Sequence, residues 1–131
     1  MIVDTSAWVD YLRHTGSPVD VALEAAIANG EHILVPELVV MEVLVGAADD
    51  ESARQLRRLM HSFEVVSIAP LVDTEMAAAM QRRCRRSGRP VRNMIDCIIA
   101  AMAVRLGEPV LHRDRDFDAL AEVTDLDVVT P

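Results

Sequence analysis

The segment MIVDTSAWVDYL, residues 1–12, decides how the chain begins to fold. An apolar, strand-like run ends on Asp4, and a helical pattern starts directly after it with Thr5 and Ser6. A carboxylate at the point where a buried strand passes into a helix has two explanations. Asp4 either caps the helix or forms one corner of a metal site assembled from distant parts of the chain. The choice depends on whether the rest of the sequence supplies the other corners.

Short apolar runs alternate with helical segments along the whole chain. The sequence predicts strands at 1–3, 32–35, 65–68, 109–111 and 127–129. It predicts helices near 5–14, 18–29, 37–47, 50–61, 71–87, 94–106 and 116–122. Such alternation indicates one α/β domain, residues 1–131, whose sheet is largely parallel and joined by right-handed crossovers. Ligands of such sheets bind beyond the carboxyl ends of the strands, where Asp4 lies.

Composition excludes several classes of protein. Hydrophobic residues make up 51% of the chain but aromatic residues only 3%, so we expect an aliphatic core. No stretch approaches the roughly 18 apolar residues of a membrane span, and the N-terminus has no signal-peptide pattern. The two cysteines, Cys84 and Cys97, are too few for a disulfide framework and are expected to be reduced thiols. These features predict a cytoplasmic protein without membrane contact.

Two acidic residues lie inside segments that are otherwise apolar. Glu42 stands in PELVVMEVLVG (36–46), a helix without a polar face that we expect to be buried. A buried carboxylate is costly or protonated unless something compensates it, and an ion pair with an arginine is one structural explanation. Asp96 lies one turn inside NMIDCIIAAMAV (93–104), where Asn93 and Asp96 form an approximate capping box.

A third group of acids follows the strand in PVLHRDRDFDAL (109–120), namely Asp114, Asp116 and Asp118. One of them can cap the next helix, and the others can be solvated. Alternatively, Asp114 and Asp116 meet Asp4, Glu42 and Asp96 at one edge of the sheet, where their mutual repulsion requires a cation. A carboxylate cluster without a convincing His or Cys ligand suits Mg²⁺ or Mn²⁺ rather than zinc.

Positive charge is concentrated in one segment. All 13 basic residues are arginine, and six of them stand in QRRCRRSGRPVR (81–92), which contains no acid although the net charge is −8. Helical geometry places Arg82, Arg85 and Arg86 on one face of this segment. The face is either a solvated surface that balances the acidic body or a ridge that binds nucleic-acid phosphates.

Four motifs in order along the chain carry a resemblance to a known family: IVDTSAWVDYL, ELVVMEVLVG, MIDCIIAAMAV and VLHRDRDF. The chain resembles PIN-domain ribonucleases and, more narrowly, the VapC-type toxins of bacterial toxin–antitoxin pairs. The resemblance implies a PIN-like three-layer α/β/α sandwich. It also implies an acidic quartet, with Asp116 as a frequent fifth member; the quartet comprises Asp4, Glu42, Asp96 and Asp114.

The resemblance further assigns roles to these residues. One or two Mg²⁺ or Mn²⁺ ions would be held by Asp4, Asp96 and Asp114 or Asp116. Glu42 would be an outer or second-metal carboxylate and a candidate acceptor of the attacking water's proton. Ser6 matches a small hydroxyl residue that helps order a metal-bound water or carboxylate. His112 replaces the family's usual Thr or Ser, which leaves the hydrogen bonding around Asp114 open.

The implied activity is that of an endoribonuclease toxin that hydrolyses RNA with a metal-activated water. The implied partners are RNA, a VapB-like antitoxin and a second copy of the chain. The apolar helices near 8–12, 37–47 and 50–60 are expected to supply a groove for a partner helix and a homodimer contact. Two other classes are left open: a metal-dependent DNA nuclease or phosphatase, and a catalytically silent interaction module.

Overall fold

The computed structural model describes all 131 residues and contains a four-stranded, entirely parallel sheet. The strands are β1 (Ile2–Val3), β2 (Leu34–Pro36), β3 (Glu64–Val66) and β4 (Val110–Leu111). Their order across the sheet is β3-β2-β1-β4. The predicted fifth strand at 127–129 is wrong as a strand, because only one bridge forms there, between Val110 and Val128. β4 is two residues long and offers this segment little backbone to pair with.

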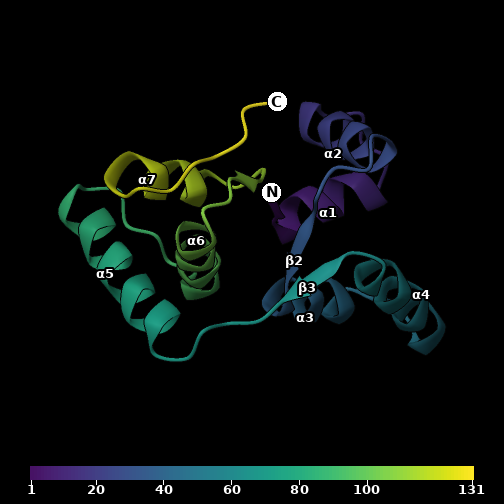
Figure 1. Cartoon of the computed structure of the whole chain (residues 1–131), viewed down its shortest axis with the longest axis horizontal. Helices are drawn as coiled ribbons and strands as arrows, with labels where there is room; N and C mark the ends of the chain where they lie inside the picture. The colour runs from purple at the N-terminus through teal and green to yellow at the C-terminus, as the bar shows by residue number, and fades with distance from the viewer.

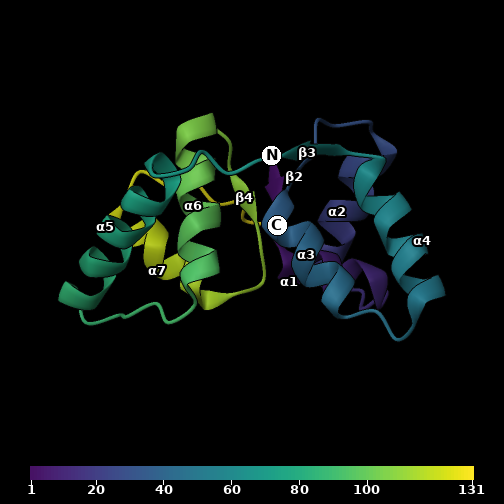
Figure 2. The same ribbon diagram turned by 90° about the horizontal axis from the view of Figure 1, so that it is seen from below.

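Seven helices cover the sheet on both sides, as predicted for an α/β/α sandwich. They are α1 (Thr5–Leu12), α2 (Pro18–Ala28), α3 (Glu37–Val45), α4 (Asp50–His61), α5 (Val72–Arg86), α6 (Met94–Leu106) and α7 (Arg115–Val123). Figure 2 shows the strands in the middle, with α5, α6 and α7 on one side and α1 to α4 on the other. No helix is long and apolar enough to cross a membrane.

Local signals explain where the helices begin and end. The side chain of Ser17 caps α2, whose first residue is Pro18, and the side chain of Asp49 caps α4. These residues satisfy backbone N–H groups that the first turn of a helix leaves without partners. At the C-terminal end of α6, Gly107 adopts a left-handed conformation with φ of 68°, which terminates the helix at little steric cost.

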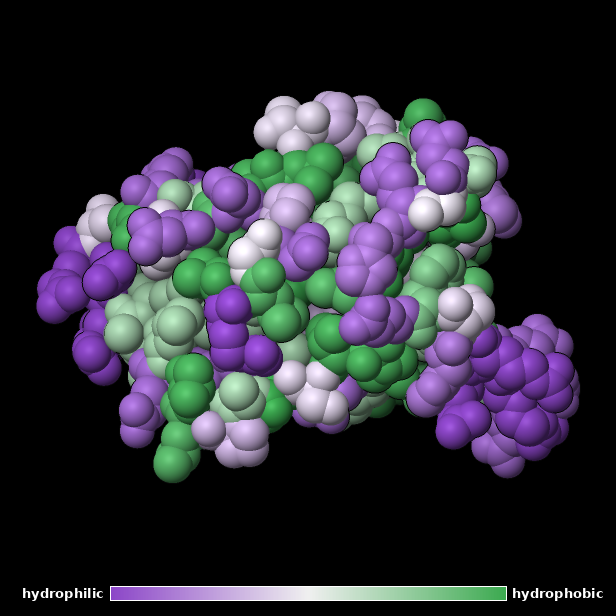
Figure 3. Space-filling view, in the orientation of Figure 1, coloured by the Kyte–Doolittle hydropathy of each residue, from purple (hydrophilic) through white to green (hydrophobic).

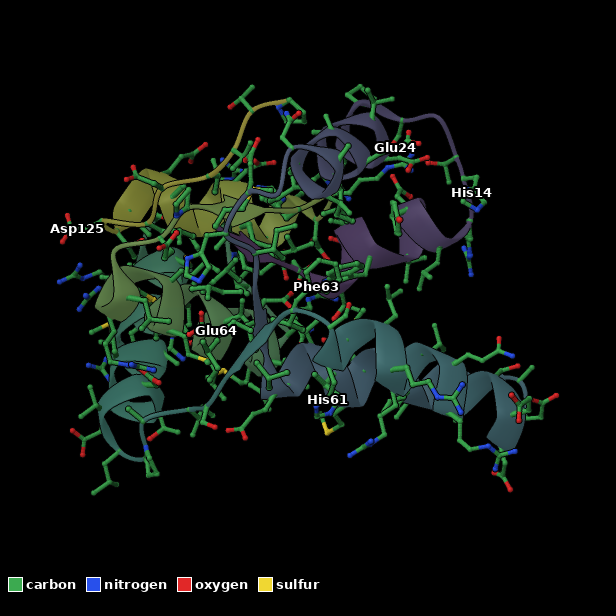
Figure 4. All side chains as sticks on the ribbon, turned by 45° about the vertical axis from the view of Figure 1, so that its right-hand side comes forward. His14, Glu24, His61, Phe63, Glu64 and Asp125 are labelled. Atoms are coloured by element: carbon green, nitrogen blue, oxygen red, sulfur yellow. The ribbon has the colours of Figure 1, made fainter.

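The core is aliphatic, as predicted, and α6 runs through it. Asp96 and Cys97 near its start and the run from Ile99 to Ala103 are buried, whereas Met94 and Leu106 at its two ends are exposed. The single tryptophan, Trp8, is fully buried on α1 with its ring 5.2 Å from that of Phe63. Phe63 lies between α1 and α4 (Figure 4).

The expectation that the Glu42 helix is buried all round is wrong. Val39 and Val43 of α3 are buried, but Met41 is 46% and Val45 is 81% exposed. α3 packs against α1 and α4, so its outer side is uncovered in the single chain. Figure 3 shows hydrophobic residues gathered over the middle of this face, around α3, and hydrophilic residues on the projecting end of α4.

The topology brings the acidic segments to one edge of the sheet. β1 leads into Asp4, β2 leads into the helix that carries Glu42, and β4 leads into Asp114. These three strands are neighbours, and parallel strands present their carboxyl ends to the same edge. A short connection joins α6 to β4, so α6 runs antiparallel to the strand and its N-terminal turn, with Asp96, reaches the same edge (Figure 2).

Candidate active site

Three carboxylates meet where the N-terminal ends of α6 and α7 converge. Asp96, Asp114 and Asp116 each place a carboxylate oxygen within 4.8 Å of the others. Asp114 is the N-cap of α7 and accepts the backbone N–H of Asp116 at 3.0 Å. The positive ends of the two helix dipoles partly offset the repulsion among these acids. The structure thus brings together three of the acids predicted to form the site.

Asp4 both caps a helix and faces this cluster. Its carboxylate accepts the backbone N–H of Ser6 at 2.9 Å and the Ser6 hydroxyl at 2.5 Å, which caps α1. Asp4 is only 3% exposed. Burial raises the pKa of its carboxyl, the two bonds from Ser6 oppose this shift, and the negative charge of Asp114 adds to it. Capping and membership of the acidic cluster are therefore not alternatives for this residue.

Asp96 is the least compensated carboxylate of the site. Its Oδ1 accepts a bond from the side-chain amide of Asn93 at 2.9 Å, while its Oδ2 is buried without any hydrogen-bond partner. Burial raises the pKa of Asp96 to about 7, and the nearby charge of Asp4 contributes further. The predicted capping box is modified, because Asn93 caps the N–H of Ile95 and bonds Asp96 through its side chain.

Glu42 approaches the cluster from α3. It is half-buried and accepts a 2.5 Å hydrogen bond from the hydroxyl of Thr5. It forms no ion pair with an arginine, so the structural explanation by an ion pair is wrong. Its charge is one of those that raise the pKa of Asp96, which places the two carboxyls in the same electrostatic environment. All members of the predicted quartet therefore lie at one edge.

Ser6 ties the two ends of the chain together at this edge. Its hydroxyl oxygen accepts the backbone N–H of Arg113 at 2.9 Å while its own proton goes to Asp4. The guanidinium of Arg113 in turn binds both carboxylate oxygens of Asp10, at 2.7 and 2.6 Å. The loop after β4, which carries Asp114, is thus fixed to both ends of α1.

The structure shows how His112, which replaces the Thr or Ser expected at this position, takes part in the hydrogen bonding around Asp114. Its ring nitrogen Nδ1 accepts the backbone N–H of Asp114 at 3.2 Å, and the ring lies 5.0 Å from that of Phe117. A hydroxyl at this position would offer the same kind of acceptor. The histidine therefore keeps the backbone of Asp114 in place by a different atom.

The predicted arginine face lies on α5, outside the acidic cluster. Arg82, Arg85 and Arg86 are exposed on the last turns of α5, and Met80 and Cys84 are buried on the other side of the helix, as predicted. The C-terminal end of α5 lies at the outer flank of the edge where α6 and α7 begin (Figure 2). The arginines that form ion pairs are Arg54, Arg89, Arg105 and Arg113. The predicted face is therefore free to bind another molecule, and its role stays a prediction.

Sequence reasoning missed several residues that hold the site together. Thr5, Asp10 and Arg113 make contacts across elements that no local pattern reveals. Asp10 is only 6% exposed. The one signal available in the sequence was that Asp10 is a second acid on the helix that follows Asp4. Burial favours a higher pKa for Asp10, but hydrogen bonds from Ser17 and Arg113 outweigh it and lower the pKa.

A concave surface adjoins the acidic edge. A cavity of about 490 Å³ lies between α1, the end of α3 and α4, and its apolar lining includes Val9, Leu12, Val43, Leu56 and Leu59. Glu42 also lines it, so the cavity opens beside the carboxylates. The helices predicted to supply a groove therefore do form one.

The site fits a hard divalent cation. Three carboxylate oxygens are close enough to share one ion, and the unpartnered Oδ2 of Asp96 is a buried acceptor that lacks a positive group. Mg²⁺ and Mn²⁺ prefer such oxygen ligands, whereas zinc favours histidine and cysteine. Neither Cys84 nor Cys97 belongs to the cluster; both are buried and free, as predicted.

Comparison with known proteins agrees with this geometry. The family model described as PIN domain matches residues 1–123. The chain is 39% identical over 127 residues to ribonuclease VapC11 of Mycobacterium tuberculosis, covering 96% of this chain and 95% of the relative. The chain therefore belongs to the PIN-domain family. Within that family it belongs with the VapC ribonucleases, since VapC19 of the same organism is also 35% identical over 107 residues, 79% of each chain.

Solved structures confirm the fold. VapBC2 from Rickettsia felis, bound to a promoter DNA fragment, aligns with a TM-score of 0.75 and 15% identity, covering 98% of this chain and 96% of that one. A toxin–antitoxin complex from Klebsiella pneumoniae aligns with a TM-score of 0.73 and 23% identity, covering 99% and 96%. The three-layer PIN-like sandwich predicted from the sequence is thereby confirmed.

Proposed function

We propose that this protein is a Mg²⁺- or Mn²⁺-dependent endoribonuclease that acts in the cytoplasm as the toxin of a toxin–antitoxin pair. The observation that carries the proposal is the buried, unpartnered Oδ2 of Asp96 beside Asp114 and Asp116. An acidic edge of this kind needs a cation to be stable with all carboxylates ionised. The kinship with VapC ribonucleases supports RNA as the substrate.

Four carboxylates of the site have one oxygen held by a hydrogen bond within the protein, and in Asp114 this oxygen accepts the backbone N–H of Asp116. Hydrogen bonds from Ser6 go to Oδ2 of Asp4, the bond from Asn93 goes to Oδ1 of Asp96, and Thr5 bonds Oε2 of Glu42. The other oxygen of Asp4, of Asp96 and of Glu42 is held in position but makes no hydrogen bond, so it is free to bind a cation. Asp4, Asp96, Asp114 and Asp116 would hold the cation, and Ser6 and His112 would keep two of these ligands in place.

Glu42 is suited to accept a proton. It approaches the cluster from a different helix, is half-buried, and keeps Oε1 free of hydrogen bonds. A carboxylate at this position would take the proton of a water that attacks the phosphodiester. The bound Mg²⁺ or Mn²⁺ would lower the pKa of that water and neutralise charge that develops on the phosphate oxygens. Attack by water predicts products with 5′-phosphate and 3′-hydroxyl ends.

A direct test is to incubate the purified chain with total RNA, with no metal, with Mg²⁺ or with Mn²⁺, and to map the new ends. We expect cleavage only with metal, and new 5′-phosphate ends. A panel that includes single-stranded DNA, duplex DNA and a phosphomonoester separates the proposal from a DNA nuclease or phosphatase of the same fold. Absence of cleavage of every substrate would favour a silent interaction module and contradict the proposal.

The proposed partner is an antitoxin of VapB type. The groove between α1, α3 and α4 is lined by apolar side chains and opens beside Glu42, so a helix in the groove can place a following basic side chain among the carboxylates. Such an arginine or lysine would compete with the metal. The exposed Met41 and Val45 of α3 support a homodimer contact next to the groove.

Expression with and without the product of the neighbouring gene tests the partner. We expect growth arrest by this chain alone and recovery when a stable complex forms with the neighbour. Replacing Leu56, in the groove, by Glu should abolish the recovery while the free enzyme still cuts RNA. Harmless expression of an enzyme that is active in vitro, or the absence of a complex, would contradict the toxin assignment but not the ribonuclease assignment.

A further inference from the structure

A second cavity, of about 250 Å³, lies on the other side of Asp114. Its walls are the start of α2, the loop from His112 to Arg115, Asp118 of α7, and the last four residues of the chain. Figure 1 shows the C-terminal segment running from α7 toward α2, where it closes this side of the molecule. The backbone of the segment is held by hydrogen bonds between Val110 and both Asp127 and Val129. The cavity is therefore a formed feature that shares Asp114 with the acidic edge.

His112 presents an unused donor to this cavity. It is 8% exposed, and its Nδ1 accepts the N–H of Asp114, so the ring proton lies on Nε2. Nε2 is 3.6 Å from Oδ1 of Asp118, which is longer than a hydrogen bond. Because His112 lines the cavity and its Nε2 has no good acceptor within the chain, this N–H is available to donate to water or to a ligand in the cavity.

The lining of the cavity offers one unpaired cation, Arg115, together with the carboxylates of Asp114 and Asp118. Arg115 is exposed, stands between Asp114 and Asp116 in the chain, and forms no ion pair, whereas Arg113 is committed to Asp10. The carboxylate of Asp118 is 55% exposed beside the Nε2 of His112. The cavity therefore offers a free cation, Arg115, and an adjacent donor and acceptor, His112 and Asp118.

We propose that this cavity binds the RNA nucleotide next to the scissile phosphate, an inference that rests on the proposed ribonuclease activity. Arg115 binds a backbone phosphate, and His112 and Asp118 bind the edge of the base. The space corresponds to roughly eight water molecules at about 30 Å³ each, which suits one nucleotide and excludes a helix about 10 Å wide. No Phe, Tyr or Trp lines the cavity, and the proposal assigns recognition of the base to hydrogen bonds from His112 and Asp118.

The two nitrogens of His112 can be tested separately. In His112→Asn the amide oxygen stands near the position of Nδ1 and still accepts the Asp114 N–H, but the Nε2 donor is lost. In His112→Gln the side-chain amide reaches the position of Nε2, but the acceptor for Asp114 is lost. The first variant should change RNA binding and spare Mn²⁺ binding, and the second should do the reverse. A merely structural role for His112 would change both measurements in both variants.

RNA affinity is measured by titrating labelled single-stranded RNA of mixed sequence into metal-free protein that carries Asp96→Asn, which prevents cleavage. We expect His112→Asn, Asp118→Asn and Arg115→Gln each to weaken binding about five-fold, the typical effect of losing one hydrogen bond. Asp118 and Arg115 are surface residues, so these two variants should remain folded whatever His112→Asn does. The matched control is Arg58→Gln on α4, an exposed arginine without an ion pair, which should leave affinity unchanged.

Cleavage by the same variants with Asp96 intact completes the test. We expect the set of cleaved sites in total RNA to shift in Asp118→Asn and His112→Asn, because contacts with the base edge choose the site. If the unmodified enzyme cuts RNA but all three variants bind and cut as it does, the cavity does not bind the nucleotide and the inference fails alone. If they instead weaken only the complex with the antitoxin, the cavity serves a protein, and the inference is also overturned. If the unmodified enzyme cuts no RNA, the proposed function itself has failed.

Discussion

Two pairs of buried aspartates show opposite solutions to the same physical problem. Asp10 and Asp73 each bind an arginine: Arg113 holds Asp10 at 2.6 Å, and Arg105 holds Asp73 at 2.8 Å. Burial favours a higher pKa for both carboxyls, but the hydrogen bonds and charge that they receive outweigh it and lower the pKa. Asp4 and Asp96 are equally buried but have no cationic partner, and their pKa values are raised.

The difference separates carboxylates that serve the scaffold from carboxylates that serve a ligand. Arg105 also donates to the carbonyl of Ser67, so the Asp73 pair fastens the connection between β3 and α5. Nothing in the chain plays this part for Asp96, whose Oδ2 has no partner. A buried charge that the fold leaves uncompensated marks a functional site when it lies at an accessible edge. The following predictions test this contrast.

The largest expected effect is on catalysis. Asp96→Asn should reduce RNA cleavage at least about a thousand-fold, because one ligand of the cation becomes neutral and metal positioning is lost. The variant should remain folded, since an amide keeps the Oδ1 acceptor for Asn93 and removes the repulsion with Asp4. Cleavage assays and circular dichroism measure the two effects.

The control for this variant is Asp125→Asn, at the opposite end of α7 from the acidic edge and exposed (Figure 4). It should leave cleavage unchanged. If Asp96→Asn unfolds, or cuts RNA at the rate of the unmodified chain, then Asp96 belongs with the scaffold acids and the contrast is wrong.

The pH dependence of stability should differ in sign between the two pairs. Because the pKa of Asp96 is raised to about 7, the folded state keeps a proton that the unfolded state loses near pH 4. The free energy of unfolding of the metal-free protein should therefore fall between pH 4 and 7 by up to about 4 kcal/mol from this group. Asp10 and Asp73, whose pKa values are lowered, contribute stability above pH 4 that is lost in acid.

Chemical denaturation of the metal-free chain and of Asp96→Asn across this pH range isolates the contribution of Asp96. The difference in stability should favour the variant, grow with pH and level off above pH 7. Saturating Mn²⁺ at pH 8 should stabilise the unmodified chain more than the variant. A difference that does not change with pH would mean that Asp96 is ionised throughout and compensated by a group that we have not identified.

A smaller effect, on stability alone, is expected at the scaffold pair. Asp73→Asn leaves the guanidinium of Arg105 without its carboxylate and should lower the free energy of unfolding by about 3 kcal/mol. The folded fraction should cut RNA normally, because Asp73 lies at the end of α5 remote from the acidic edge (Figure 2). Glu75→Gln, an exposed neighbour on the same helix, should have no effect on stability. Loss of cleavage in folded Asp73→Asn would show that the two kinds of carboxylate are not separate.

The smallest effect is expected at the arginine face of α5. Neutralising Arg82, Arg85 and Arg86 together should weaken RNA binding and reduce its salt dependence by roughly one unit of slope per lost phosphate contact. Affinity measured over a range of salt concentrations gives this slope. Metal binding should not change, and neutralising Arg57 and Arg58 on α4 should not alter the slope. An equal slope in the triple variant would assign the face to solubility or to a protein partner.

The sequence predicted the elements of the fold because their signals are local. The limits of α4 and α6 agree with prediction to the residue, since each has a capping residue and a clear period. α3 was assigned correctly but its burial was not, because an apolar face looks the same whether a core or a partner covers it. The segment 127–129 has the composition of a strand, but pairing depends on the length of its neighbour.

The carboxylates of the site were also visible in the sequence, since acids are rare inside apolar segments. Two of their supports were visible too, since the capping box placed Asn93 beside Asp96 and the resemblance assigned Ser6 to order a carboxylate. Thr5 and Arg113 are ordinary residues in ordinary positions, and only the fold brings them to Glu42 and Ser6. The cavity that His112 lines depends in the same way on the fold, because its walls come from α2, the loop after β4 and the C-terminal segment.

The hydrogen bond between Ser6 and Arg113 also bears on when the enzyme becomes active during its own synthesis. It joins residues 107 positions apart, and the same edge needs Asp4 from the start of the chain and Asp114 from near its end. β4 is likewise the last strand to be made, and it pairs with the first. A ribosome-bound chain that has emerged only as far as α5 contains Asp4 and Glu42 but lacks Asp96 and Asp114. It therefore has two of the four carboxylates and no complete site. Ribonuclease activity therefore requires nearly the whole chain, whereas the segments that form α1, α3 and α4 are made before β4 and α7.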